Sequence, residues 1–384
     1  MNLSEILSNE ELRQHEFPVT REKIYLAHAG VCPLPRRVSE AIRAYATQCT
    51  QGDQEAFMPA PQIQKSRELA ARLLKAQPEE IAFVGPTSLA LSFVASGLQF
   101  KKGDNILIYF DDYPSNVYPW MALAEKGVQV RLLNIRELGK IQPIDILGQV
   151  DEQTRLVALA SNHFVAGYRI DIRAIGDFLR QRNILFCVDG IQSLGAFPTT
   201  VESVDFLAAD AHKWLLGPCA AGIFFVRKSF QEKLRPPVYG WHNVHCPNYS
   251  ALEKIIYPSN ARRYEAGTEN LLGLAGLTAA LEMILEIGLG NIAAELLRKR
   301  SFLITELQKK NYQILNADAP PENASSIISF FHANTDLPAL HKKLTDANII
   351  TSLRADRTGR QYIRLSPHFY NTNAELDQLL ERLD

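Results

Sequence analysis

The sequence predicts an α/β protein with a mainly parallel central sheet flanked by helices, followed by a smaller α+β C-terminal domain. The apolar runs of the first two thirds lack polar alternation, which is typical of strands buried on both faces of a sheet. These runs alternate with helical patterns, the order that joins parallel strands through crossover helices. After Pro258 the pattern changes to a long helical stretch followed by short strands and helices.

Seven apolar runs are predicted to be strands of the large sheet. They cover residues 81–85, 105–110, 128–133, 155–160, 184–189, 205–210 and 221–227. Helices are expected between them over 87–98, 117–126 and 170–183, and the last of these has a clear amphipathic pattern.

The C-terminal part is predicted to begin with one helical stretch over 271–310, broken near Gly288–Gly290. Strands are then expected over 328–330, 348–353 and 361–366, with helices over 336–347 and 373–384. The predicted division is an N-terminal segment (1–23), a large domain (24–258) and a small domain (259–384), which agrees with a length of 384 residues.

Composition excludes several classes of protein. The chain is 46% hydrophobic and 22% charged, so it has enough apolar surface to fold. With 41 basic and 42 acidic residues the net charge is −1, which gives no electrostatic footprint for nucleic acid. The longest apolar region, 271–289, contains two glutamates and falls short of a membrane span. Five scattered cysteines and an acidic N-terminus without a signal pattern predict a cytoplasmic protein.

Polar clusters follow five of the predicted strands, where open α/β sheets bind their ligands. They lie at 85–88, 112–116, 162–164, 189–192 and 210–213. The chain lacks the glycine-rich fingerprints of dinucleotide and P-loop sites, the H-E-x-x-H zinc motif and the G-x-S-x-G nucleophile elbow.

The remaining residues offer an anion site, an acid and a lysine. Thr87 and Ser88 open a helix, whose first amides favour a phosphate. Asp189 ends an apolar strand, and Lys213 lies in an apolar stretch that would lower its pKa and make it nucleophilic. A phosphate cradle, a carboxylate for a pyridinium nitrogen and a Schiff-base lysine are the parts that pyridoxal 5'-phosphate (PLP) requires.

Six segments carry a family resemblance in a fixed order. They are YLAHAGVCPLP (25–35), DYPSNVYPW (112–120), VDGIQSLG (188–195), ADAHKWLLGP (209–218), YEAGTEN (264–270) and YIRLSPHFYNT (362–372). Together they resemble the class V aminotransferase superfamily of PLP-dependent fold type I enzymes, which includes cysteine desulfurases and isopenicillin N epimerase-like proteins. The resemblance covers nearly the whole chain and implies the PLP-dependent transferase fold.

The resemblance also implies roles for cofactor-binding residues. Lys213 is the Schiff-base lysine, and His212 lies near the phosphate. Asp189 pairs with the pyridine nitrogen, Gln192 contacts the ring oxygen, and Tyr113 stacks on the ring. Lys213, Asp189 and Tyr113 are therefore the expected catalytic residues.

The remaining implied roles concern the substrate and a second subunit. Arg364 is expected to bind the substrate α-carboxylate, with His28 and Arg354 also on the substrate side. Thr268 is expected to reach the phosphate of the partner subunit, which implies a homodimer with shared active sites.

One segment departs from the family pattern. Phe164 stands where the related desulfurases have an asparagine, and Asn162 and His163 precede it. Which of these three residues contacts the ring oxygen stays open, with Asn162 and His163 taken as the cofactor-binding candidates.

Each of these residues has an ordinary structural explanation when it is taken alone. Lysines are mostly exposed, Asp-Gly is a common turn, and Thr and Ser often cap helices. Arg364 would fit an exposed ion pair. It is their combination that favours the PLP site. The H-x-x-H-C cluster at 242–246 has no second group of ligands nearby in sequence, so no metal site is expected.

The reaction type depends on residues that face the substrate. A desulfurase needs a nucleophilic cysteine shortly before the carboxylate arginine, and residues 351–362 contain none. We therefore expect aminotransferase-like chemistry on a small amino acid. A C–S lyase or cysteine desulfurase-like activity, or an epimerase, on the same scaffold is the alternative. A non-catalytic α/β dimer is the alternative of a different class. No nucleic-acid or membrane partner is expected.

Overall fold

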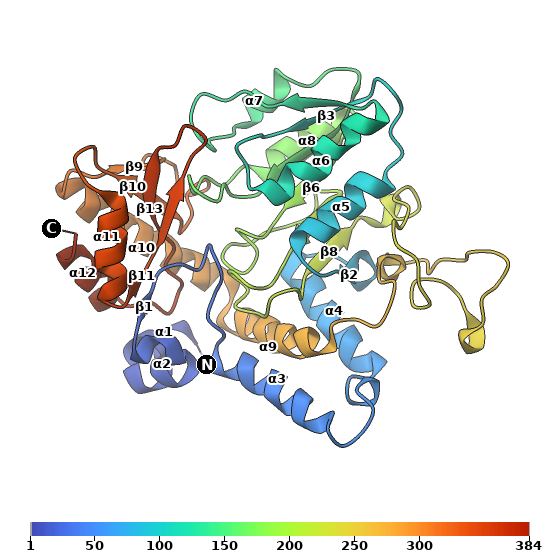
Figure 1. Cartoon of the computed structure of the whole chain (residues 1–384), viewed down its shortest axis with the longest axis horizontal. Helices are drawn as coiled ribbons and strands as arrows, with labels where there is room; N and C mark the ends of the chain where they lie inside the picture. The colour runs from blue at the N-terminus through green and yellow to red at the C-terminus, as the bar shows by residue number, and fades with distance from the viewer. Residues whose placement is uncertain (1, 384) are drawn as a thin grey trace.

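A seven-stranded sheet forms the centre of the larger part of the molecule in the computed structural model, which describes residues 2–383 (Figure 1). Its strand order is β2-β8-β7-β6-β5-β3-β4, and β8 alone runs antiparallel to its neighbours. The strands are β2 (Ile81–Phe83), β3 (Asn105–Ile108), β4 (Gln129–Leu132), β5 (Thr154–Ala160), β6 (Leu185–Asp189), β7 (Phe206–Ala209) and β8 (Ile223–Val226). The predicted α/β class and all seven predicted strands are confirmed.

Alternate residues of the central strands enter two different apolar layers. In β6, for example, Phe186 and Val188 pack on one side of the sheet and Cys187 packs on the other. The first layer includes residues of α4 (Ala60–Leu74), α8 (Ile172–Gln181) and α9 (Leu271–Ile287), and the second includes residues of α5 (Thr87–Gly97) and α6 (Tyr118–Met121). Because both faces are covered, the central strands have no polar alternation, whereas the edge strand β4 is partly exposed and alternates polar and apolar residues.

A four-stranded antiparallel sheet forms the smaller part, in the order β12-β13-β10-β9. Its strands are β9 (Gln313–Ile314), β10 (Ile328–Phe331), β12 (Ser352–Ala355) and β13 (Gln361–Leu365). Helices α10 (Leu289–Lys309), α11 (Leu337–Asp346) and α12 (Asn373–Glu381) share its apolar core. The last residue of the predicted helix 373–384 lies outside the described residues.

Two sequence predictions differ from the structure in detail. The predicted helix 117–126 is α6 followed by a 3₁₀ segment, Ala122–Lys126. The predicted strand 348–353 is divided into β12 and a separate strand β11 (Ile349–Ile350), which pairs in parallel with β1 (Ile24–Tyr25). The sequence contained no local signal for this pairing, because the two strands are more than 300 residues apart.

The N-terminal helices α1 (Leu3–Ser8) and α2 (Glu10–Glu16) pack against the small part. Arg13 forms an ion pair with Glu375, with Nη1 2.7 Å from Oε1, and the rings of Phe17 and Tyr370 stack with their centroids 4.1 Å apart. These contacts bring the start of the chain to the loop that follows β13.

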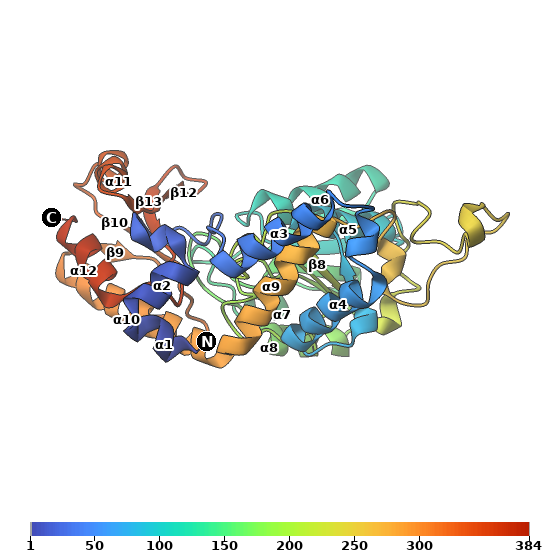
Figure 2. The same cartoon turned by 90° about the horizontal axis from the view of Figure 1, so that it is seen from below.

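Helix α9 lies beside α3 (Arg36–Gln48) and α4, on the large-sheet side of the molecule (Figure 2). It meets α10 at Gly288, whose φ of 88° favours glycine, and the two helix axes are bent by 77°. The predicted break is confirmed. No single described helix is long and apolar enough to cross a membrane, and only the bent pair α9–α10 passes that test by length and composition. The division at residues 23 and 258 stays a prediction.

Further short helical segments lie before and between these elements. Helix α7 (Pro143–Leu147) follows β4, and the 3₁₀ segment Pro18–Arg21 follows α2. Neither was predicted from the sequence.

Candidate active site

A cavity of about 300 Å³ lies where the carboxyl ends of the large sheet face the small sheet. It is lined by nine of the residues that the sequence predicted for the site. They are Thr87, Ser88, Tyr113, Asp189, Gln192, His212, Lys213, Arg354 and Arg364. Segments that are distant in sequence therefore meet in one place.

Lys213 lies in this cavity just after β7 and is only 7% exposed. Its Nζ forms no hydrogen bond or ion pair with any described residue, and it lies 5.3 Å from the centre of the Tyr113 ring. Burial lowers the pKa of Lys213 to about 8, and Asp189 opposes this effect while Arg364 adds to it. A buried amine with a low pKa and no partner is suited to react as a nucleophile.

Asp189 ends β6 and is 2% exposed. One carboxylate oxygen, Oδ1, accepts the amide of Ile191 at 3.0 Å, and the other accepts no hydrogen bond from a described residue. Burial and the nearby charge of Asp112 raise the pKa of Asp189 to about 7, while Lys213 opposes the shift. A cation beside the free oxygen would favour the charged carboxylate.

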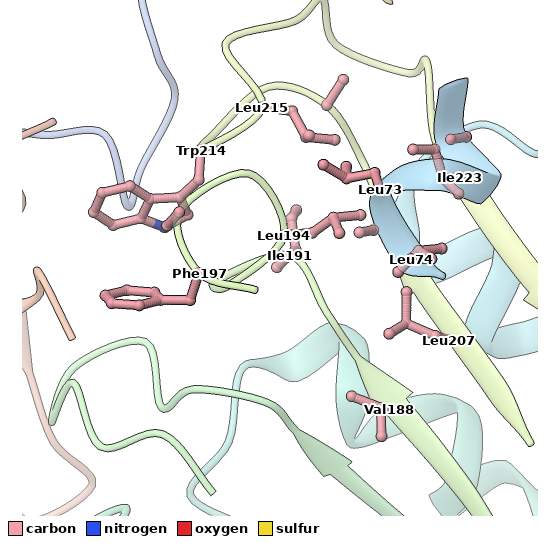
Figure 3. Close-up of a cluster of buried hydrophobic side chains, with 14 of the residues drawn as sticks. Leu73, Leu74, Val188, Ile191, Leu194, Phe197, Leu207, Trp214, Leu215 and Ile223 are labelled. Carbon is pink, nitrogen blue, oxygen red and sulfur yellow. The ribbon is translucent and has the colours of Figure 1, made fainter. Parts of the chain in front are cut away.

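The apolar core holds both of these residues in position (Figure 3). Val188 and Ile191, on either side of Asp189, pack in the same cluster as Trp214, the residue after Lys213. The indole Nε1 of Trp214 also donates to Gln192 Oε1 at 3.0 Å. Side chains next to the reactive groups are thus locked by packing, which fixes the orientation of the reactive groups.

Tyr113 forms one wall of the cavity, in the loop after β3. Its ring meets the Phe164 ring edge to face, with centroids 5.4 Å apart. Its amide donates to Asp112 Oδ1 at 2.7 Å, while Asp112 Oδ2 accepts from Asn116 and Ala160. Asp112 was not singled out from the sequence, although it directly precedes Tyr113 in the second polar cluster.

One end of the cavity lies at the start of α5. The Thr87 and Ser88 amides open this helix and have no intrahelical acceptor. Thr87 Oγ1 accepts the Asp210 amide at 2.9 Å, and Asp210 Oδ2 lies 2.8 Å from His212 Nδ1. Asp210 therefore orients both Thr87 and His212. The sequence analysis named Asp210 only as part of a polar cluster.

Two arginines from the small sheet face the same cavity. Arg364 is 1% exposed and donates to the Phe164 carbonyl at 2.7 Å and to Ser352 Oγ at 3.3 Å. Its Nε is buried without a partner, as is Nε of Arg354. Burial, together with the charge of Arg354, lowers the pKa of Arg364 to about 9.

Three predicted residues lie behind the cavity wall. His28 is fully buried, with Nε2 2.7 Å from the Tyr370 hydroxyl and Nδ1 2.9 Å from the Ser366 carbonyl. His163 is held between the Asp111 carbonyl and the Ala166 amide, and Asn162 Nδ2 donates to the Gln192 carbonyl. Burial lowers the pKa of both histidines to about 4.

Phe164, from the same segment as Asn162 and His163, lines the cavity instead. Of these three residues the ring of Phe164 therefore has direct access to a bound molecule. The Asn162 Oδ1 atom is buried without a described partner.

Thr268 lines a second cavity, of about 500 Å³, together with Trp241 and His242. Its hydroxyl donates to Glu55 at 2.9 Å. Within one chain, the structure does not bring Thr268 to Lys213. In the same region His242, Glu265 and Glu269 come close enough to share an ion, but both carboxylate oxygens of Glu265 already bond Arg67.

None of the five cysteines lines the cavity of Lys213, and all five are described by the structure and unpaired. Cys32 adjoins Val31, which does line it, but its Sγ points to the Gly217 carbonyl at 3.8 Å. Burial raises the pKa of the Cys32 thiol to about 12, so the thiolate is disfavoured.

Comparisons with known proteins show the family to which the chain belongs. The family model for aminotransferase class V matches residues 24–379. A probable cysteine desulfurase of Methanothermobacter thermautotrophicus is 29% identical over 98% of each chain, and an uncharacterized aminotransferase of Bacillus subtilis, YcbU, is 28% identical over 96% of this chain and 95% of its own. The apo structure of a cysteine desulfurase from Thermococcus onnurineus NA1 superposes with a TM-score of 0.87 at 25% identity, covering 98% of this chain and 97% of that one.

The chain belongs to the class V aminotransferase family. It has the fold type I architecture and is a PLP-dependent enzyme, a transferase or a lyase. The predicted family, fold, cofactor and enzyme class are thus confirmed.

Proposed function

We propose that this protein uses PLP to carry out aminotransferase-like chemistry on a small amino acid, with Lys213 as the residue that bonds the cofactor. The observation that carries the proposal is Lys213 itself, a buried amine without a partner, in one cavity with Asp189 and two arginines. The larger cavity lined by Thr268 contains no lysine among its described residues.

The cavity fits PLP at each end. Its positive groups are Lys213, Arg354 and Arg364, and Asp189 is the acid that faces them. This excess of positive charge favours a ligand with phosphate and carboxylate groups. The free oxygen of Asp189 suits the pyridinium N–H, and the start of α5 suits the phosphate. Tyr113 and Phe164 provide aromatic surface for the ring.

Bound PLP supplies an electron sink that stabilises a carbanion at the substrate α-carbon. Asp189 would keep the pyridine nitrogen protonated, because a carboxylate beside that nitrogen favours its charged form. Since its pKa is about 8, Lys213 Nζ can both accept and return a proton near neutral pH. Arg364 would hold the substrate α-carboxylate in its planar fork, since its Nε has no protein partner.

A protein persulfide, as in desulfuration, is less well supported by the site. The strand that precedes the carboxylate arginine brings Arg354 into the cavity rather than a cysteine, and a guanidinium cannot act as a nucleophile. The nearest cysteine in sequence to a lining residue, Cys32, has its thiol turned into the protein. A C–S lyase that releases sulfur without an enzyme thiol remains the second candidate, because it needs only the same carbanion.

We further propose a homodimer with shared active sites, in the cytoplasm. Support comes from Thr268, which lies in a separate cavity, where its hydroxyl donates to Glu55. Support also comes from the exposed apolar residues of the projecting segment 239–257, among them Tyr249 and Ile255 (Figure 1). Mixing Lys213→Ala with Thr268→Arg and refolding the two together should restore part of the activity, whereas an active monomer would exclude shared sites. Unpaired cysteines are typical of a reducing compartment.

Borohydride reduction of the holoenzyme followed by peptide mapping tests the central proposal. The pyridoxyl group is expected on Lys213, since no other lysine lines this cavity. Label on Lys228 or another surface lysine would refute the assignment. A panel of amino acids scored by cofactor absorbance and by product would then separate transamination from elimination.

A further inference from the structure

We propose that the substrate carries a second carboxylate and that Arg354 binds it, so that the enzyme prefers a short dicarboxylic amino acid. This inference rests on the proposed function, because it assigns the α-carboxylate to Arg364. It goes further in naming the side-chain chemistry of the substrate and the residue that selects it.

The register of the small sheet places the two arginines on one face. In the antiparallel pair β12–β13, Ser352 lies opposite Arg364 and Arg354 lies opposite Tyr362. Residues two apart on a strand share a face, so Arg354 and Arg364 are diagonal neighbours. The residues between them, Leu353 and Ile363, point to the opposite side and pack in the small core.

The two guanidinium groups converge on one point of the cavity. A Cβ atom on Gly30 would lie 3.7 Å from Arg364 Nη2 and 3.9 Å from Arg354 Nη2. The absence of a side chain at Gly30 leaves this point open to a bound molecule. Two cationic forks that face the same small space suit two carboxylates on one short carbon skeleton.

Arg354 has no anionic partner of its own among residues 2–383. Its side chain forms no hydrogen bond or ion pair with a described residue, and its Nε is buried without a partner. Other arginines of the same hairpin are occupied, since Arg357 pairs with Asp111 at 3.0 Å and Arg360 lies over the Phe331 ring. A half-buried guanidinium without a partner is costly unless a ligand supplies the anion.

The hairpin that carries Arg354 is held in place against the large part. The Arg357–Asp111 pair links its tip to the loop after β3, and Arg357 also lies 5.1 Å from the centre of the Phe110 ring. The Tyr362 hydroxyl donates to Asp356 at 2.7 Å. Arg354 is therefore presented from a fixed position, as a selecting residue needs to be.

Ligand titration of the holoenzyme, followed by cofactor absorbance, tests the inference with L-aspartate, L-glutamate and L-alanine as probes. Wild-type enzyme is expected to bind at least one of the dicarboxylic amino acids at least tenfold more tightly than alanine. Arg354→Gln should abolish this preference by weakening the binding of the dicarboxylic amino acid. Arg360→Gln, in the same hairpin but outside the cavity, should behave as wild type.

A second measurement does not depend on turnover. Succinate has two carboxylates and no amino group, so it should raise the melting temperature of wild-type protein more than butyrate does. The difference should be lost in Arg354→Gln.

Three outcomes would overturn the inference. Equal affinities of wild-type enzyme for alanine and for both dicarboxylic amino acids would do so, as would a loss of affinity for all of them in Arg354→Gln. Equal thermal effects of succinate and butyrate on wild-type protein would also do so. A protein that shows no spectral response to any amino acid would instead refute the proposed function, so the two failures are distinguishable.

Discussion

Lys213→Met should stabilise the cofactor-free protein, because the native lysine is buried where its charged form is disfavoured. The folded protein holds the pKa of Lys213 at about 8, against an ordinary value of 10.5. One pKa unit corresponds to about 1.4 kcal/mol, so this difference in pKa lowers the free energy of unfolding by roughly 3 kcal/mol. The Nζ atom has no hydrogen bond to lose, and Met has a similar length and no charge, so most of this free energy should be recovered.

The dependence on pH follows from the direction of the shift. The Lys213 amine binds its proton more tightly in the unfolded chain than in the folded one. Below pH 8, therefore, the free energy of folding includes the whole cost of burying the charged amine or removing its proton. As pH rises from about 8 to about 10.5 the unfolded lysine also loses its proton, and the cost disappears. The gain in unfolding free energy of Lys213→Met should therefore be roughly 3 kcal/mol at pH 7 and near zero above pH 10.5.

Urea unfolding of the cofactor-free protein at pH 7, 9 and 11 measures this effect, with equal slopes in wild type and variant as the check on the comparison. Lys254→Met serves as the matched control, since Lys254 is exposed and should give no gain at any pH. If Lys213→Met does not raise the free energy of unfolding at pH 7, or if the increase does not decline as the pH rises, the argument that burial sets the reactivity of this lysine is refuted.

Three further predictions concern the site. Arg364→Lys should raise the apparent dissociation constant for the amino acid by about 10- to 100-fold with little loss of PLP, because a charge-assisted hydrogen bond contributes roughly 1.5–3 kcal/mol. Amino-acid titration measures the first effect and cofactor absorbance measures the second. An unchanged dissociation constant would count against the role of Arg364 in binding the carboxylate. Asp189→Ala should retain some cofactor but lose most activity, and near-normal turnover would exclude its role beside the pyridine nitrogen. With cysteine the enzyme should form no protein persulfide, and any sulfur released should be accompanied by pyruvate and ammonia. Stoichiometric alanine, with sulfur on Cys32 or another cysteine, would restore the desulfurase.

Strands and polar clusters were predictable because their signals are local. Each buried strand is a short apolar run bounded by turns, and each polar cluster directly follows one. The break at Gly288 was predictable for the same reason. In contrast, helices α1 and α2 have only six and seven residues. Such short helices are unstable in isolation, and it is packing against the small part that stabilises them.

The candidate site was also predictable in outline, since its residues occupy motifs in a fixed order. Asp189 ends β6 and Arg364 lies within β13, where the sheet itself determines their direction, and Lys213 lies in the segment that follows β7. A residue's place in one of these motifs did not, however, predict whether its side chain reaches the cavity. His28 lies in the first of the six motif segments, yet its two ring nitrogens bond Tyr370 and Ser366 behind the wall of the cavity.

What the sequence by itself determined is the class of fold and the cofactor, because hydrophobic period and motif order are properties of neighbouring positions in the chain. Only the tertiary structure decided that Phe164 rather than His163 reaches the cavity, and that Arg354 shares a sheet face with Arg364. These facts depend on strand register and on pairings between distant segments. A shift of one residue in the register of β12 would turn Arg354 to the opposite face, so side-chain direction is settled by packing and not by the local sequence.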